Sequence, residues 1–303
     1  MSDLKLFNIR NGVQELKGES VALEKSLQNL LEANLSDFLG VRFLASEYST
    51  GEIHGGRMDT IGIDENNCPV IIEYKRSMNQ NVINQGLYYL DWLMDHKASF
   101  KLMVMERLGA DIAKEIEWSS PRLLCIAGDF TKFDEHAVRQ INRNIELIRY
   151  KKYEDELLLL ELVNASSGTT DVISNTETGI VEKKKYKTVT DYLNQSDEKL
   201  TDLYENIREF LLNLGNDVQE KTLQYYIAFK RFHNFACLVI QPKTNNILVY
   251  LKVNPKSIEL EEGFTRDMTG IGHVAPGDLE VTLYNNEDFD KAKDLFVRSY
   301  EGS

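Results

Sequence analysis

The sequence predicts a chain of two parts, an α/β domain with a central mixed sheet flanked by helices and, after it, a smaller α+β domain. Short apolar runs alternate with helical patterns before residue 164, which is typical of an α/β sheet. Residues 164–187 are rich in Ser, Thr and Gly and lack apolar periodicity, which indicates a linker. We therefore expect domains at residues 1–163 and 188–303.

The first domain is expected to open with a helix at 21–35, because leucines recur there at helical spacing after Ser20, a suitable N-cap. The turn residues 64–69 join two predicted strands, 57–63 and 70–75, into a hairpin. The other expected elements are a strand at 41–48, a helix at 81–97, strands at 100–105 and 122–127, helices near 110–117 and 134–144, and a buried strand at 156–163.

The second domain is expected to begin with helices between residues 190 and 215, where Leu200, Leu203 and Ile207 form an apolar stripe. Strands at 235–240 and 247–253 flank a turn and form a second hairpin, and a final helix is expected at 287–300. The aromatic side chains between 225 and 235 are assigned to the core of this domain rather than to base stacking.

The composition restricts the classes of function. A net charge of −13, with neither half of the chain basic, argues against holding duplex by bulk electrostatics. Any contact with nucleic acid must then come from a local patch, a metal ion or a partner. No stretch approaches the roughly 18–20 apolar residues of a membrane helix, and three scattered cysteines make no disulfide framework. We expect a soluble, cytoplasmic protein without membrane contact and with buried free thiols.

Three charged residues of the first hairpin are predicted to share one face of the sheet. Glu73 and Lys75 are two residues apart on one strand, and Asp59 lies on the partner strand in line with Ile61 and Ile63. Both carboxylates stand where apolar side chains are expected, and a half-buried carboxylate is costly unless it is paired or bound to metal. A divalent cation would account for the cluster.

The residue types suit hydrolysis of a phosphate ester. Oxygen ligands are those that magnesium prefers, so Asp59 and Glu73 would be the ligands. Lys75 cannot ligate while protonated, but it can orient the attacking water or stabilise the charged transition state. Glu24 borders the apolar stripe of the first helix and either joins the two carboxylates or is a surface charge.

Asp59, a turn and then Ile72-Glu73-Tyr74-Lys75 resemble the Asp…(Asp/Glu)-x-Lys signature of the PD-(D/E)xK nuclease superfamily. Glu24 upstream, Arg57 and a helix with Gln85 and Tyr89 resemble its RecB-like branch, in which a QxxxY motif follows the lysine. The span 23–89 is most similar to NucS-type endonucleases and to related bacterial proteins of unknown function. The second half resembles an uncharacterised domain often found behind such nuclease domains.

This resemblance implies a restriction-endonuclease-like fold and a role for each matching residue. Magnesium or manganese would be held by Glu24, Asp59, Glu73 and the carbonyl of Tyr74. Lys75 would be catalytic. Gln85 and Tyr89 would position the lysine, the water or a phosphate, and Arg57, Arg76 and Tyr89 would contact the substrate. DNA is the favoured substrate, in repair or defence, and a homodimer is a further expectation.

NucS-type proteins carry a DNA-binding domain ahead of the nuclease, whereas only about 20 residues precede the first helix here. We therefore expect targeting by the second domain, by a partner subunit or by self-association. The competing hypothesis is a nucleic-acid- or protein-binding module on a nuclease fold that does not cut, and the acidic charge favours it. The sequence contains no GxSxG elbow, Walker A loop, GxGxxG or HExxH motif.

Overall fold

The computed structural model describes residues 4–19, 24–51, 55–75, 82–154, 156–166 and 188–303. The chain divides into two compact units. The first comprises Met1–Asp37, Val41–Asp64 and Cys68–Thr170, and the second Phe38–Gly40, Glu65–Asn67 and Asp171–Ser303. Each unit has its own hydrophobic core.

The first unit is built on a mixed sheet. Its described strands are β3 (Gly18–Glu19), β4 (Val41–Ser49), β5 (Arg57–Asp64), β6 (Pro69–Lys75), β7 (Arg122–Ala127), β8 (Asn144–Tyr153) and β9 (Leu157–Ser166). Their order is β3-β8-β7-β6-β5-β4, with β9 paired to β8. The neighbours β6, β7 and β8 run parallel and the other pairs antiparallel. A separate hairpin, β1 (Leu6–Asn8) with β2 (Gln14–Leu16), precedes them.

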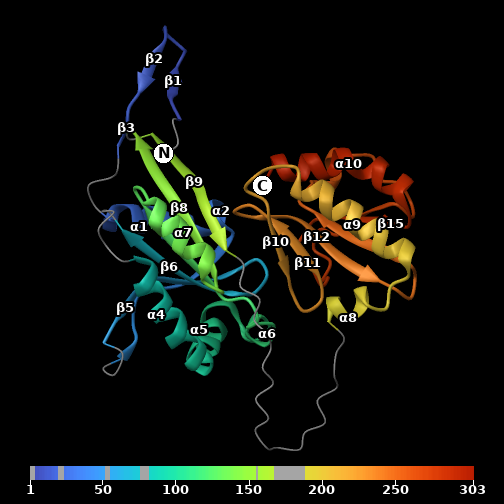
Figure 1. The fold of residues 1–303 in the computed structure, drawn as a ribbon, viewed down its shortest axis with the longest axis horizontal. Helices are drawn as coiled ribbons and strands as arrows, with labels where there is room; N and C mark the ends of the chain where they lie inside the picture. Colours follow the sequence, from blue (N-terminus) through green and yellow to red (C-terminus); the bar gives the residue numbers. More distant parts are fainter. Residues whose placement is uncertain (1–3, 20–23, 52–54, 76–81, 155, 167–187) are drawn as a thin grey trace, which may run out of the picture. The chain divides into compact units, whose positions relative to one another are not determined.

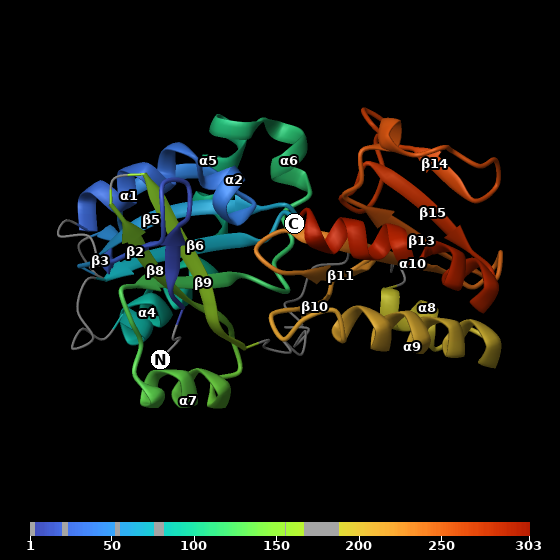
Figure 2. The same ribbon diagram turned by 90° about the horizontal axis from the view of Figure 1, so that it is seen from above.

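Helices lie on both faces of this sheet (Figures 1 and 2). The described helices are α1 (Glu24–Ala33), α2 (Leu35–Leu39), α4 (Val82–Asp95), α5 (Lys97–Leu108), α6 (Ala110–Lys114) and α7 (Lys132–Gln140). Helix α4 packs closely on β7, because a Cβ at Gly86 would lie 2.4 Å from a methyl group of Leu123. Helix α1 reaches the opposite face, where Glu32 accepts a hydrogen bond from Thr60. The hairpin β5–β6 therefore lies between two helices.

Two of the expected strands in this unit are wrong or incomplete. Residues 100–105 belong to helix α5, in which Phe100 and Val104 are buried one turn apart while Met105 is exposed. The leucine-rich strand exists as β9, but it is half-buried, because it pairs with β8 alone among the described strands. It also continues to Ser166, into the stretch assigned to the linker, and residues 167–187 lie outside the described residues.

The other predicted elements of the first unit are present with small shifts. Residues 20–23, including the expected N-cap of the first helix, lie outside the described residues. The helix predicted at 134–144 ends at Gln140, and β8, which the sequence did not predict, begins at Asn144.

A buried ion cluster ties three strands together at the turn end of the hairpin. The guanidinium group of Arg122 on β7 donates to both oxygens of Glu146 on β8, at 2.7 and 3.0 Å, and to Oδ2 of Asp64 on β5, at 2.9 Å. Oδ1 of Asp64 also accepts from the backbone N–H of Cys68, which closes the turn of the hairpin. All three side chains are at most 3% exposed. The position of β5 and β6 is thus fixed against the parallel strands.

The second unit is an antiparallel sheet covered by helices. Its elements are α8 (Val189–Leu193), α9 (Glu198–Leu212), β10 (Gln219–Thr222), β11 (Ile227–Lys230), β12 (Asn234–Gln241), β13 (Asn246–Leu251), η1 (Pro255–Ser257), β14 (Thr265–Asp267), β15 (Leu279–Leu283) and α10 (Asn286–Glu301). The strand order is β10-β11-β12-β13-β15-β14. Ile207 of α9 and Phe296 of α10 pack on one face of the sheet with Val249 and Val281.

The predicted fold class, an α/β domain with a central mixed sheet flanked by helices followed by a smaller α+β domain, is confirmed. In the second unit both predicted strands and the final helix are present, and Phe229 and Phe235 are core residues, as expected. Strands β10, β11, β14 and β15 were not predicted. All three cysteines are free and buried. Among the described helices, none has the length and apolar character needed to cross a bilayer.

Removal of the buried guanidinium group should cost much stability. We expect Arg122→Ala to lower the free energy of unfolding by roughly 3–5 kcal/mol, because Asp64 and Glu146 would remain buried without their cation. Urea denaturation followed by circular dichroism measures the change. The control Arg139→Ala removes an exposed arginine of α7 and is expected to change stability by less than about 0.5 kcal/mol. Equal effects of the two substitutions would contradict the role given to the ion cluster.

Candidate functional site

The hairpin brings Asp59 and Glu73 together at the end opposite its turn. The register Ile61↔Ile71 and Thr60↔Ile72 makes them the next facing pair. Each carboxylate binds the other strand: the N–H of Asp59 donates to Oε1 of Glu73 at 3.2 Å, and the N–H of Tyr74 donates to Oδ2 of Asp59 at 3.0 Å. Side chains thus replace the backbone ladder here and are held in fixed orientations.

Glu73 is fully buried, and one of its oxygens has no partner. Its exposed fraction is 0%, and Oε2 accepts no hydrogen bond from the described residues. Burial, and after it the negative charge of Asp59, raise the pKa of Glu73 from 4.5 to about 8. A buried carboxyl group with a free oxygen beside a second carboxylate is a suitable place for a cation.

Lys75 follows on the same face of β6 and is half-buried. Its positive charge counteracts the rise in the pKa of Glu73, so the two side chains interact electrostatically. On the other side, Cys125 of β7 is the register partner of Glu73. Burial raises the pKa of the Cys125 thiol, and the charge of Glu73 adds to this rise, so the thiol stays protonated. The structure therefore places Asp59, Glu73 and Lys75 at one end of the hairpin.

Helix α1 supplies two polar residues that sequence reasoning missed. The side-chain amide of Gln28, 4% exposed, donates to the carbonyl oxygen of Asp59 at 2.9 Å, to Ser46 at 3.1 Å and to Glu32 at 2.9 Å. Glu32 also accepts from the hydroxyl of Thr60 at 2.5 Å. These contacts clamp the helix to the backbone of β5 at Asp59. A buried amide on the apolar side of a predicted helix was the available signal.

Helix α4 holds the start of β5 from the other face. The hydroxyl of Tyr89 accepts from the backbone N–H of Arg57 at 3.1 Å and from the side-chain amide of Gln85 at 3.2 Å. The ring packs against Gly56, where a Cβ would lie 2.5 Å from it. Gln85 and Tyr89 are therefore paired, as their spacing suggested, but Tyr89 is only 5% exposed and its hydroxyl serves the backbone of β5.

The remaining predicted residues are placed differently. Arg57 is exposed and forms an ion pair with Glu47 of β4. The phenol of Tyr74 points to the face of Thr60, away from Glu73, and only its backbone belongs to the hairpin end. The side chain of Glu24 and the whole of Arg76 lie outside the described residues. Within the described part of the chain, no group of three His, Cys, Asp or Glu residues is arranged to hold a metal ion.

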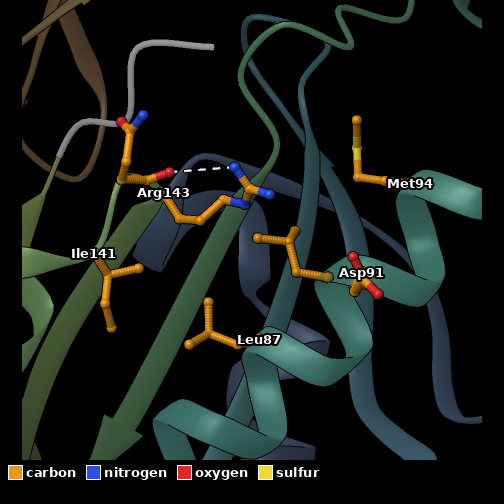
Figure 3. A pocket seen from close by; sticks show the side chains of 7 residues that line it. Leu87, Asp91, Met94, Ile141 and Arg143 are labelled. Carbon is orange, nitrogen blue, oxygen red and sulfur yellow. Dashed lines mark hydrogen bonds between the residues drawn. The ribbon is translucent and has the colours of Figure 1, made fainter.

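A pocket of about 370 Å³ lies elsewhere on the first unit (Figure 3). It is formed between Leu87, Asp91 and Met94 of α4 and the segment after α7, with Ile141 and Arg143. None of the predicted site residues lines it, and its two charged side chains are exposed. The buried, incompletely bonded Glu73 is the better candidate for chemistry.

Comparison with known proteins gives a family match for the second unit. A model described as a domain of unknown function (DUF5655) matches residues 189–303. The chain is 29% identical over 292 residues to an uncharacterized protein of Haemophilus influenzae. The aligned region covers 94% of this chain and 95% of that protein. The likeness to that protein therefore extends over both units.

Two solved structures resemble part of the chain. One is a repair endonuclease from Pyrococcus abyssi, 17% identical, with a TM-score of 0.29 over 48% of this chain and 60% of that one. The other is a complex of EndoMS with double-stranded DNA, 18% identical, with a TM-score of 0.25 over 45% of this chain and 50% of that one. The chain thus spans at most 60% of either structure, and such TM-scores transfer neither residues nor activity.

The raised pKa of Glu73 gives a pH dependence of stability in the absence of metal. Between the ordinary pKa of 4.5 and the folded value of about 8, the folded state binds a proton that the unfolded state has lost. The free energy of unfolding therefore falls as pH rises through this window. Glu73→Gln removes the titration, so at pH 8 we expect this variant to be more stable than wild type by roughly 2–4 kcal/mol.

Chemical denaturation in EDTA at pH 5 and pH 8 measures this difference. The gain should be small at pH 5, and the matched variant Glu115→Gln, at an exposed position, should show no pH-dependent gain. A difference between Glu73→Gln and wild type that is the same at both pH values would show that Glu73 titrates normally.

Proposed function

We propose that residues 1–163 form a metal-dependent nuclease that hydrolyses phosphodiester bonds, with DNA as the substrate and a role in repair or defence. The observation that carries the proposal is the position of Glu73, a fully buried carboxyl group with an unpartnered oxygen beside Asp59 and two residues before Lys75. Keeping such a group ionised in the interior costs free energy, which a bound cation would offset. The distant likeness to a repair endonuclease agrees with this proposal but does not support it further.

Asp59 and Glu73 would hold magnesium or manganese, with Glu24 and the carbonyl of Tyr74 as further ligands. Their oxygens are the hard donors that these ions prefer. A bound ion would lower the pKa of a water molecule and neutralise negative charge on the phosphate. The reciprocal hydrogen bonds of the two carboxylates with the hairpin backbone keep them oriented before any ligand arrives.

Lys75 would interact with the reacting phosphate. Lys75 follows Glu73 by two residues on β6, so the two side chains share a face, and the residue is half-buried. It can stabilise the negative charge that develops on the phosphate oxygens or orient the attacking water. Gln85 and Tyr89 would act by holding the start of β5 in place, and Arg57 and Arg76 would contact neighbouring phosphates.

A second candidate is a binding module on a nuclease fold that does not cut. The net charge of −13 favours it, as does the lack of a third metal-binding side chain beside Asp59 and Glu73 among the described residues. Such a module would bind nucleic acid or protein without turnover.

Cleavage of a panel of DNA and RNA substrates with magnesium or manganese tests the proposal. We expect wild type to cut at least one substrate, and Asp59→Ala and Lys75→Ala to lower the rate at least about 100-fold, because each removes charge from the site of reaction. The control Asp91→Ala removes an exposed carboxylate of α4 and should leave the rate unchanged.

Two results would contradict the nuclease. One is cutting that persists in both site variants, which would point to a contaminant or another site. The other is absence of cutting together with absence of magnesium and manganese binding by calorimetry, while nucleic acid still binds. That second result would favour the binding module.

A further inference from the structure

Glu47 on β4 holds two cations that come from different elements. Its Oε1 lies 2.9 Å from the ammonium group of Lys25 on α1, and its Oε2 lies 2.6 Å from Nε of Arg57 on β5. The side chains of Lys25 and Arg57 are 54% and 68% exposed, whereas that of Glu47 is 30% exposed. The carboxylate of Glu47 thus forms ion pairs with two solvent-exposed cations.

Glu47 also lies next to the candidate site and has an unusual backbone. The pairs Ser46↔Thr60 and Tyr48↔Met58 put it at the position facing Asp59 in the ladder. Its φ is 53°, in the left-handed region that residues other than glycine seldom adopt. The side chain of Glu47 is held by the two ion pairs and by a side-chain hydrogen bond with Gln28 of α1.

We propose that Lys25 and Arg57 form a binding subsite for a backbone phosphate of nucleic acid, and that Glu47 closes this subsite until the phosphate displaces it. The inference rests on the proposed function, because it assumes that nucleic acid reaches Asp59 and Glu73. Lys25 is not part of the sequence signature of the nuclease. Glu47 would compete with the phosphate for Lys25 and Arg57.

Phosphate and carboxylate are interchangeable partners for such a pair of cations. Both are anions that present oxygen acceptors to Lys and Arg, and Arg suits a phosphate especially well. An exposed ion pair contributes little to stability, so exchanging one anion for another is cheap. If the ion pairs of Glu47 only connected α1, β4 and β5, phosphate would not compete with Glu47 for Lys25 and Arg57.

Binding of a short labelled duplex, measured by fluorescence anisotropy, tests the proposal. All proteins carry Lys75→Ala and are assayed with magnesium, so that binding is separated from cutting. Glu47→Gln keeps the shape of the side chain and should tighten binding about three- to tenfold, because both cations become available. Its affinity should also fall more steeply with salt, by about one unit in the logarithmic slope.

A thermodynamic cycle distinguishes competition from simple loss of a negative charge. In a Lys25→Gln/Arg57→Gln background, Glu47→Gln should no longer tighten binding, and the control Glu115→Gln should have no effect in either background. The subsite is refuted if Glu47→Gln tightens binding equally with and without the two cations, or leaves it unchanged. Melting temperatures show that each variant is folded.

Further measurements distinguish a nucleic-acid phosphate from free phosphate, and failure of the subsite from failure of the proposed nuclease. Inorganic phosphate should compete better than chloride at equal ionic strength but far more weakly than unlabelled duplex, because it offers the same oxygens without the neighbouring contacts; competition as strong as that of duplex would overturn the assignment to a nucleic-acid backbone. If wild type cuts DNA but Glu47→Gln does not alter binding, only the subsite is wrong. If the Lys75→Ala protein binds no nucleic acid and wild type does not cut, both proposals fail.

Discussion

The buried carboxyl group of Glu73 is the constraint on which the arrangement around it depends. A sheet interior does not accept a carboxylate without compensation, and here the compensation is incomplete, because Oε1 has a backbone donor and Oε2 has none. The raised pKa of Glu73 is the measure of this cost in the metal-free protein. Asp59 increases the cost rather than relieving it. Carboxyl groups whose pKa is raised by burial and by a neighbouring carboxylate are typical of functional sites.

The rest of the first unit keeps this pair in place from a distance. A slip of one residue between β5 and β6 would turn Glu73 and Lys75 together to the opposite face of the sheet, away from Asp59. The cluster of Asp64, Arg122 and Glu146 opposes such a slip at the turn end of the hairpin. Gln28 and Tyr89 oppose it at the other end, from opposite faces of the sheet. The polar residues of this unit therefore fix register, while its apolar residues supply the burial.

The parts of the fold that the sequence predicts are those whose periodicity is local. The hairpin, α4 and the hydrophobic stripe of α9 follow from spacing alone, and so does the shared face of Glu73 and Lys75. Strand β8 escaped because Glu146 and Arg149, which are charged, are buried in ion pairs with residues far along the chain. Residues 100–105 were predicted as a strand but are helical, because a short apolar run does not distinguish a strand from a half-exposed helix. Gln28 and Glu47 escaped because their importance lies in partners 18 to 31 residues and 10 to 22 residues away.

The acidic charge of the chain is compatible with a role at nucleic acid if attraction is local. A protein of net charge −13 gains little from the general field of a polyanion, and its nonspecific binding should be weak. Cations close to the candidate site then contribute more to binding of nucleic acid than cations elsewhere. Two such cations, Lys25 and Arg57, are paired with Glu47. Such an arrangement lowers affinity for any anion that cannot displace the carboxylate from both cations. Discrimination by displacement needs no basic surface, because it depends on the difference between two anions at one site rather than on the total charge.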